Sequence, residues 1–293
     1  MKRMIPTGAV LSFAALLLLH PETASAAMEE GLLLCFRTVI PSLFPFFVVT
    51  SLLTQLGFAA LLQSVFSPLM EPLFKLRGAC ALPLLTGLLG GYPTGAKTVA
   101  DLHREGIIFR EEAELLLGFC CNCGPGFLMG FVGAGVLGGA ALGARLYVIH
   151  AASAFLTGII LCRIGPGKRP VLLPCRLPAA PLHLPQIFTG AVTGSLTSML
   201  NICAYVVIFR TAAALLPLPG AWLGTLEMVS GLTAVSPGKT GFLAAAAITA
   251  WSGFSVHCQT MAVTEDLSLK WYWPGKLIQT AIAAALAWLF CPI

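Results

Sequence analysis

Two hydrophobic segments carry their own glycine and proline clusters: Gly87-Leu88-Leu89-Gly90-Gly91-Tyr92-Pro93-Thr94-Gly95-Ala96-Lys97 and Phe119-Cys120-Cys121-Asn122-Cys123-Gly124-Pro125-Gly126-Phe127. Proline lacks a backbone N–H and clashes with the preceding helical turn, so neither segment can remain a continuous helix. Inside a bilayer, the backbone groups that such a break frees must be satisfied by protein or by a water-filled cavity. Membrane proteins that keep broken helices at depth usually line a solute site with them. The sequence therefore predicts a solute site around these breaks.

The composition places the chain in a bilayer. Of its 293 residues, 57% are hydrophobic and 10% are charged, and the mean hydropathy is +0.89. Soluble domains carry about 25% charged residues. A membrane span needs about 17 or more apolar residues, and of the longest uncharged runs only 211–226 is shorter. These runs are 4–21, 38–70, 78–96, 115–144, 146–162, 177–209, 211–226, 240–264 and 277–293. The predicted fold class is an all-α polytopic membrane protein.

Charge and cysteine usage narrow the function classes. The formal net charge of +5 is spread along the chain, so no nucleic-acid partner is expected. The ten cysteines lie mostly inside or beside apolar runs, where we expect reduced thiols. Cys120, Cys121 and Cys123 have no second cysteine pair, so no metal and no other cofactor is expected. Ser236-Pro237-Gly238-Lys239-Thr240 looks like the end of a phosphate-binding loop, but Thr233 stands where its first glycine belongs. No enzymatic function is predicted.

The N-terminus has two interpretations. Lys2 and Arg3 precede the apolar run 5–19, and small residues follow at 24–27, as in a cleaved signal peptide. The alternative is an uncleaved first span followed by an external loop, together residues 1–30. We favour the second interpretation because polytopic proteins commonly use the first span as the insertion signal.

Basic residues set the predicted topology. Arg163, Lys168, Arg169 and Arg176 form the strongest basic cluster, which the positive-inside rule places in the cytoplasm together with the N-terminus. An odd number of hydrophobic stretches lies between these two points, so one stretch must fail to cross. We expect 78–96 to be re-entrant from the cytoplasmic side. The alternative is a double crossing within 115–144, which is short for that.

The pattern recurs in the second half of the chain. Thr86-Gly87-Leu88 followed by Pro93 matches Ser230-Gly231-Leu232 followed by Pro237, and a lysine follows each proline. The Asn122–Pro125 break corresponds to residues 251–259. Run 38–70 corresponds to 177–209, and 146–162 to 277–293. Several matches in register indicate a duplication.

Counting crossings makes the two units inverted, an architecture of secondary transporters. The units are a first repeat at 31–165, a cytoplasmic linker at 166–185 and a second repeat at 186–293. About seven crossings and two re-entrant segments result, with the C-terminus outside. We expect the charged segment 97–114 to be a solvated helix pair. Trp271, Tyr272 and Trp273 beside Lys270 and Lys276 are expected to anchor the chain at the cytoplasmic interface.

Polar residues at membrane depth are the candidate site residues. A polar side chain is energetically costly there, so its presence indicates a function. Asn122 either hydrogen-bonds a solute or lies at a packing kink. Lys97 and Lys239 either attract an anion or extend to the interface. Glu227 either binds a coupling proton or sodium ion or pairs with Arg210 or Lys239. The full predicted set is Gly91, Pro93, Lys97, Asn122, Gly124, Pro125, Glu227, Ser230, Pro237, Lys239, Ser252, Ser255, His257 and Gln259.

The same residues carry a family resemblance. Pro41-Ser42-Leu43-Phe44-Pro45-Phe46-Phe47, residues 90–97, Asn122-Cys123-Gly124-Pro125 and residues 252–259 resemble the sporulation integral membrane protein YlbJ family, which carries the nucleoside-recognition gate domain. The resemblance covers the chain from about residue 31 onwards.

The resemblance implies a transporter-like protein of the bacterial cell membrane that is associated with moving dipicolinic acid toward the developing spore. It would lie in the mother-cell membrane around the forespore. The expected partners are the lipid bilayer, a small anion such as dipicolinate and a coupling ion, while a homo-oligomer stays open. The alternatives are a nucleoside-type carrier and a non-transporting sporulation scaffold, whose partner would bind the segment 97–114.

Overall fold

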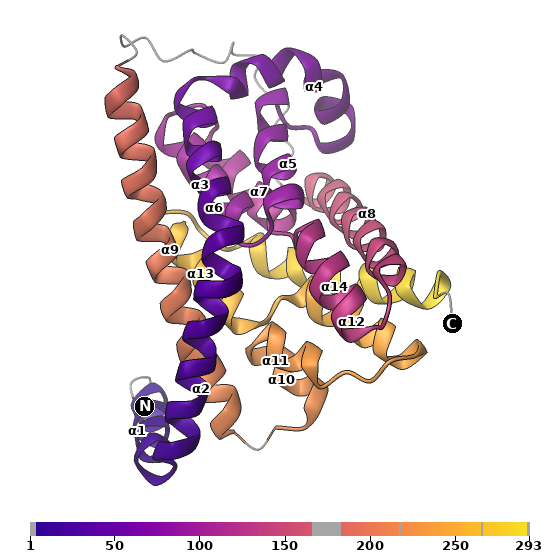
Figure 1. The fold of residues 1–293 in the computed structure, drawn as a ribbon. Coiled ribbons are helices and arrows are strands. Elements are labelled where there is room, and N and C mark those ends of the chain that lie inside the picture. The colour runs from indigo at the N-terminus through magenta and orange to yellow at the C-terminus, as the bar shows by residue number, and fades with distance from the viewer. Residues whose placement is uncertain (1–3, 166–182, 217, 265, 292–293) are drawn as a thin grey trace.

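The computed structural model describes residues 4–165, 183–216, 218–264 and 266–291, and all regular structure in them is helical (Figure 1). This confirms the predicted all-α class. Lys168, Arg169 and Arg176 of the basic cluster lie outside the described residues. The helices, including short 3-10 and π segments (η), are α1 (Met4–Leu19), α2 (Pro21–Leu34), η1 (Cys35–Val39), α3 (Ile40–Gln55), α4 (Phe58–Phe74), η2 (Gly78–Cys80), α5 (Ala81–Gly90), α6 (Thr94–Arg104), α7 (Arg110–Cys120), η3 (Phe127–Val136), α8 (Ala140–Ile164), α9 (Leu184–Leu215), η4 (Gly220–Trp222), α10 (Leu223–Leu226), α11 (Met228–Thr233), α12 (Lys239–Trp251), α13 (Gly253–Val263) and α14 (Tyr272–Leu289).

Length and composition support several membrane crossings. Three helical stretches are long and apolar enough to cross a bilayer: Ala140–Ile164, Leu184–Leu215 and Lys239–Val263. The number rises to five if each of two bent helix pairs is one span. The first pair bends by 103° between α1 and α2, and the second by 85° between α3 and α4. The chain is therefore a polytopic membrane protein with broken helices.

The N-terminal region differs from its expectation. Residues 21–34, part of which we expected as an external loop, form helix α2. Helices α2, η1 and α3 follow one another without a break and rise together beside α9 (Figure 1). The two long elements touch closely, since Gly31 lies against the backbone and side chain of Val207.

One face of this long helix pair is apolar and exposed. Phe36 is 67% exposed, Leu196 49% and Leu200 60%. Lipid tails are as apolar as leucine, so such side chains are at home on a bilayer-facing surface. Between the two helices lies a buried apolar cluster formed by Cys35, Phe47, Met199, Ile202 and Val206.

The remaining helices form a compact group that positions the site. Helices α5 and α6 make a hairpin that turns between Gly90 and Thr94, and the Thr86 hydroxyl donates to the Thr98 hydroxyl across it at 3.0 Å. The apolar stretch Gly78–Gly90 is shorter than a span. This geometry agrees with the predicted break and return of the chain at residues 90–93.

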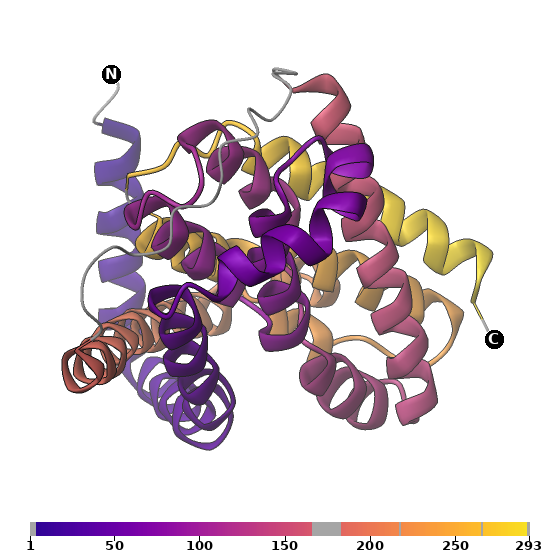
Figure 2. The same ribbon diagram turned by 90° about the horizontal axis from the view of Figure 1, so that it is seen from above.

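Two broken helices run in opposite directions beside the hairpin. Helix α7 ends at Cys120 and the chain becomes helical again at Pro125, while α12 ends at Trp251 and α13 begins at Gly253. The start of α7 lies at the far end of α13, because Arg110 donates to the Asp266 carbonyl at 2.9 Å. The two interrupted helices are therefore antiparallel. Figure 2 shows from above that α9 stands at one edge of the helix group, seen nearly along its axis.

The charged segment is more closely packed than expected. Most of α6 is buried, so the prediction of a solvated helix pair is wrong for it. Arg104 donates to the Val263 carbonyl at 3.3 Å, and Glu114 accepts from the Ser268 backbone at 3.1 Å. These bonds attach the α6–α7 connection to the α13–α14 connection.

A glycine contact between α7 and α14 generates the first prediction. A methyl group added at Gly275 would lie 2.6 Å from Gly118 Cα, whereas one at Gly194 on α9 would meet no heavy atom within 4 Å. We expect Gly275→Ala to destabilise the protein by about 1–3 kcal/mol, because backbone must shift. Gly194→Ala should leave stability unchanged or slightly raised, since alanine favours helix. Thermal unfolding in detergent measures both, and equal Tm values for the two variants would contradict the packing described.

Candidate functional site

The first break is held against the hairpin by glycines. Gly87 and Gly95, one on each arm of the hairpin, both face the carbonyl of Cys120, and a Cβ atom on either would collide with that oxygen. At the turn, Gly91 has a φ of 82°. A Cβ there would lie 3.0 Å from the Gly124 nitrogen. The missing side chains let the end of α7 approach the hairpin backbone directly.

The second break contacts α10 and α11 in a comparable way. Ser252 and Gly253 have φ values of 76° and 78°. A Cβ on Gly253 would lie 3.1 Å from the Leu226 carbonyl oxygen and 3.2 Å from the Met228 nitrogen. The interruption of α12–α13 therefore meets the interruption between α10 and α11. Each broken helix is paired with a second interrupted element.

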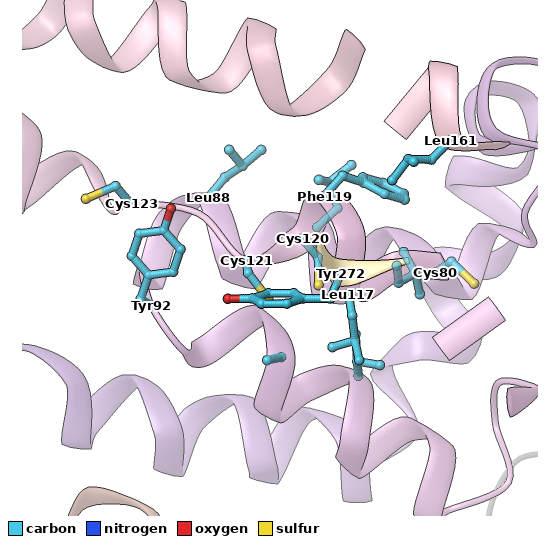
Figure 3. Close-up of a cluster of buried hydrophobic side chains, with 14 of the residues drawn as sticks. Cys80, Leu88, Tyr92, Leu117, Phe119, Cys120, Cys121, Cys123, Leu161 and Tyr272 are labelled. Carbon is cyan, nitrogen blue, oxygen red and sulfur yellow. The ribbon is translucent and has the colours of Figure 1, made fainter. Parts of the chain in front are cut away.

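Lys276 of α14 connects both breaks and the hairpin. Its ammonium donates to the carbonyls of Cys121 at 2.8 Å and Ala250 at 3.1 Å, and to the Tyr92 hydroxyl at 3.0 Å. Its side chain is fully buried. The Tyr92 hydroxyl donates in turn to the Thr249 carbonyl at 3.0 Å. Figure 3 shows Tyr92 and Cys121 in this buried region, with the Tyr272 ring beside Cys121.

A side-chain amide pair continues this polar junction. Gln279, three residues after Lys276, donates from Nε2 to Asn122 Oδ1 at 2.8 Å. Asn122 donates from Nδ2 to the Phe119 carbonyl at 2.8 Å, which satisfies the end of α7. Both amides are buried. We define the buried junction as Tyr92, Asn122, Lys276 and Gln279 with the carbonyls of residues 121 and 250.

Two buried histidines contact residues next to the junction. His150 on α8 accepts from the Cys123 backbone at 3.0 Å through Nε2. His257 on α13 lies 2.7 Å from the Tyr272 hydroxyl through Nδ1. Its ring packs edge-on against Trp251 and Trp273, with centroids 4.6 and 4.9 Å apart. His150 therefore satisfies the backbone just after the end of α7, and His257 contacts the first residue of α14.

A second polar group surrounds Arg210 of α9. Arg210 donates to Glu30 at 2.8 Å, and its Nη1 lies 3.8 Å from Glu227 Oε2. Glu227 also caps α11, since it accepts from the backbone of Val229 and Ser230 at 2.9 and 2.7 Å. A cavity of about 280 Å³ lies here, lined in part by Glu30, Arg210 and Ser230. Of the two partners expected for Glu227, the structure shows Arg210.

The predicted residues fall into three groups. Gly91, Asn122 and Gly124 meet at the buried junction, where Pro93 begins the returning arm and Pro125 the second half-helix. Glu227 and Ser230 lie at the Arg210 cavity, next to the second break. Ser252, Ser255, His257 and Gln259 are buried at and after that break, with Gln259 donating to Ser255 at 3.3 Å.

The three remaining predicted residues lie apart. Lys97 is paired with Asp101 at 2.6 Å. Pro237 and Lys239 are exposed at the start of α12, where the Lys239 ammonium lies 4.5 Å from the centre of the Trp288 ring. Helix α12 has 13 residues, so Lys239 is about 20 Å along the helix axis from the break. The matching Gly-to-Pro spacing does not bring the two lysines to equivalent places.

Tyr92, Lys276 and Gln279 are the junction side chains that we did not predict as site residues. We expected Lys276 to anchor the interface beside Trp271–Trp273, and this is wrong because its side chain is fully buried. Lys270 is exposed and lies 5.7 Å from the centre of the Trp271 ring, as an anchor would. A signal for the buried role was present: positions 272, 276, 279 and 283 fall on one face of a helix.

Interrupted antiparallel helices around a buried polar junction define a polytopic membrane protein of the transporter-like class. The model of the Gate family, described as nucleoside recognition, matches residues 36–292. The chain therefore belongs to the Gate nucleoside-recognition family. It is similar to the "Sporulation integral membrane protein YlbJ" of Bacillus subtilis (strain 168), with 27% identity over 327 aligned residues that cover 95% of this chain and 80% of the relative. The predicted family resemblance is confirmed. No solved structure matches the chain.

The cap on α11 generates the second prediction. Glu227→Ala removes the acceptor of two backbone N–H groups and of the Ser230 hydroxyl. We expect a loss of about 1–2 kcal/mol in stability, the usual cost of removing a helix cap. Glu29→Ala is the matched control, because Glu29 is exposed within α2. Thermal unfolding in detergent tests this, and an equally small shift for both variants would show that the cap contributes nothing.

Proposed function

We propose that this protein carries a small anionic solute across the membrane by alternating access between two inverted halves. The observation that carries the proposal is the convergence of two broken helices and a hairpin on Lys276, at a fully buried position. In secondary transporters, discontinuous helices meet at the solute and ion sites near the bilayer midplane. Membership of a nucleoside-recognition family supports a small-molecule solute.

Charge supports an anion. Among the described residues, none of the ion pairs involves Lys276, so its positive charge is surrounded by neutral oxygens. The N-terminal ends of α6 and of the half-helix after Gly124 lie at the same junction and carry positive partial charge. In the described conformation Asn122 and Gln279 bond to each other. A solute carboxylate would accept these amide N–H groups in place of that bond.

Antiparallel geometry supports inverted halves. The start of α7 lies near the α13–α14 connection, and the start of α12 lies near the end of α14. Gly91 meets Gly124 at the first break, and Gly253 meets the Leu226–Met228 backbone at the second. These parallels favour repeats at 31–165 and 186–293, with about seven crossings, re-entrant segments and the C-terminus outside.

The relative's name suggests a solute made during sporulation. A "Sporulation integral membrane protein" covers 95% of this chain. Dipicolinate, a small aromatic dianion of spores, fits a positively charged junction lined by tyrosines. We therefore propose dipicolinate as the solute and the mother-cell membrane around the forespore as the location. The description of the family favours a nucleoside as the second candidate.

A scaffold without transport is less well supported. Its partner was expected to bind the segment 97–114. Asp101, Glu112 and Glu114 of this segment all accept hydrogen bonds from within the chain. Much of the segment's charge is therefore already used to hold the helices together.

Uptake into proteoliposomes tests the carrier. We expect dipicolinate to enter vesicles that contain the protein faster than empty vesicles, and nucleosides to enter more slowly. Asn122→Ala should lower dipicolinate uptake about tenfold, corresponding to about 1.4 kcal/mol of lost interaction. The matched control is Asn201→Ala, because Asn201 is exposed on α9.

The outcomes separate the proposals. Uptake of nucleosides alone would replace the anion, and uptake of neither solute would remove the carrier. Asn122→Ala protein that is as abundant as the unaltered protein and transports equally well would remove Asn122 from the site.

A further inference from the structure

The surroundings of Lys276 have the composition of a cation site. Four oxygens face its ammonium: the carbonyls of Cys121 and Ala250, the Tyr92 hydroxyl, and Gln279 Oε1 at 3.5 Å. They come from both broken helices, from the hairpin turn and from α14 itself. The Tyr92 ring adds its face, with its centre 4.6 Å from the ammonium nitrogen.

The two carbonyls explain why a cation belongs there. Cys121 follows the last residue of α7, and Ala250 is the second-last residue of α12. Helix C-termini carry negative partial charge and leave carbonyls without helical partners. In secondary transporters such unwound carbonyls and half-helix C-termini coordinate the coupling sodium ion or proton. Hard cations take oxygen ligands of this kind.

The ammonium occupies this position completely. Lysine has three N–H donors and no acceptor, and four oxygens are available to it here. Its side chain is fully buried, so no donor is directed to solvent. The oxygen set therefore leaves no room for a metal ion beside the lysine.

We propose that Lys276 is a built-in replacement for a coupling metal ion: its ammonium holds the two broken helices together where a transporter of this architecture would bind sodium. This deepens the proposed function and rests on it for one consequence, that the solute moves without sodium coupling. A second consequence concerns the oxygen ligands alone and does not depend on transport. Removing the ammonium leaves an oxygen cage that binds an alkali-metal cation.

Thermal unfolding of the full chain in lipid nanodiscs tests the cage. Tm is measured in NaCl and in choline chloride at equal ionic strength. We expect the unaltered protein to have the same Tm in both salts. Lys276→Ala should have a lower Tm in choline chloride and regain most of the loss as NaCl is raised, with saturation. Lys276→Met should have a lower Tm that NaCl does not restore, because its side chain still fills the cage.

Lys270→Ala, at an exposed lysine, should behave like the unaltered protein in both salts. A Tm of Lys276→Ala that does not depend on sodium would overturn the proposal. If that variant does not fold, binding of radioactive sodium to the unaltered protein decides: saturable binding at this cage, lost in Lys276→Met, overturns the proposal, and its absence supports it.

Transport separates this inference from the proposed function. We expect dipicolinate uptake by the unaltered protein to be equal in sodium and choline media. Sodium-driven uptake would overturn the replacement while leaving the carrier intact. No uptake of any solute, together with restoration of the Lys276→Ala Tm by sodium, would remove the carrier and keep the cation cage.

Discussion

A buried ammonium among main-chain carbonyls is the constraint on which the rest of this structure depends. An unpaired charge inside a protein in a bilayer is costly, and such a residue persists only where other groups compensate for it. Here the compensation comes from two helices that stop beside it. The dependence is mutual, because the carbonyls that the breaks set free would be unsatisfied without a donor. The lysine and the breaks therefore stabilise each other.

This mutual dependence explains the small residues around the junction. For the ends of α7 and α12 to reach one ammonium, the hairpin and α14 must approach closely. Gly87 and Gly95 allow the first approach, and Gly118 and Gly275 allow the second. The same arrangement suits a moving part. A helix interrupted at one point can turn about that point, and both interrupted helices contact the Lys276 ammonium at their breaks. The neutral hydrogen bond between Gln279 and Asn122 can be exchanged for hydrogen bonds to a solute at small cost in free energy.

Local chemistry predicted the breaks well, and spatial neighbours less well. Proline and glycine end helices for reasons carried by the residue itself, so the interruptions near Pro93, Pro125 and Ser252 could be found in the sequence. Asn122 was found because a lone amide in an apolar run needs a partner. Lys276 was missed because aromatic residues just before it imitate an interface anchor, and three of its four oxygen partners lie between 26 and 184 residues away in the chain. Lys239 was predicted to be a site residue because its motif matches the one before Lys97. The motif does not determine which end of α12 lies near the break, and Lys239 lies at the other end.

An experimental structure of the full chain in lipid nanodiscs tests the central claim most directly. The account predicts that cryo-electron microscopy at side-chain resolution shows both helices interrupted, with density from the Lys276 amine joined to the main-chain oxygens of residues 121 and 250. Continuous helices through residues 121–124 and 252, or a Lys276 side chain extended to the membrane surface, would contradict it.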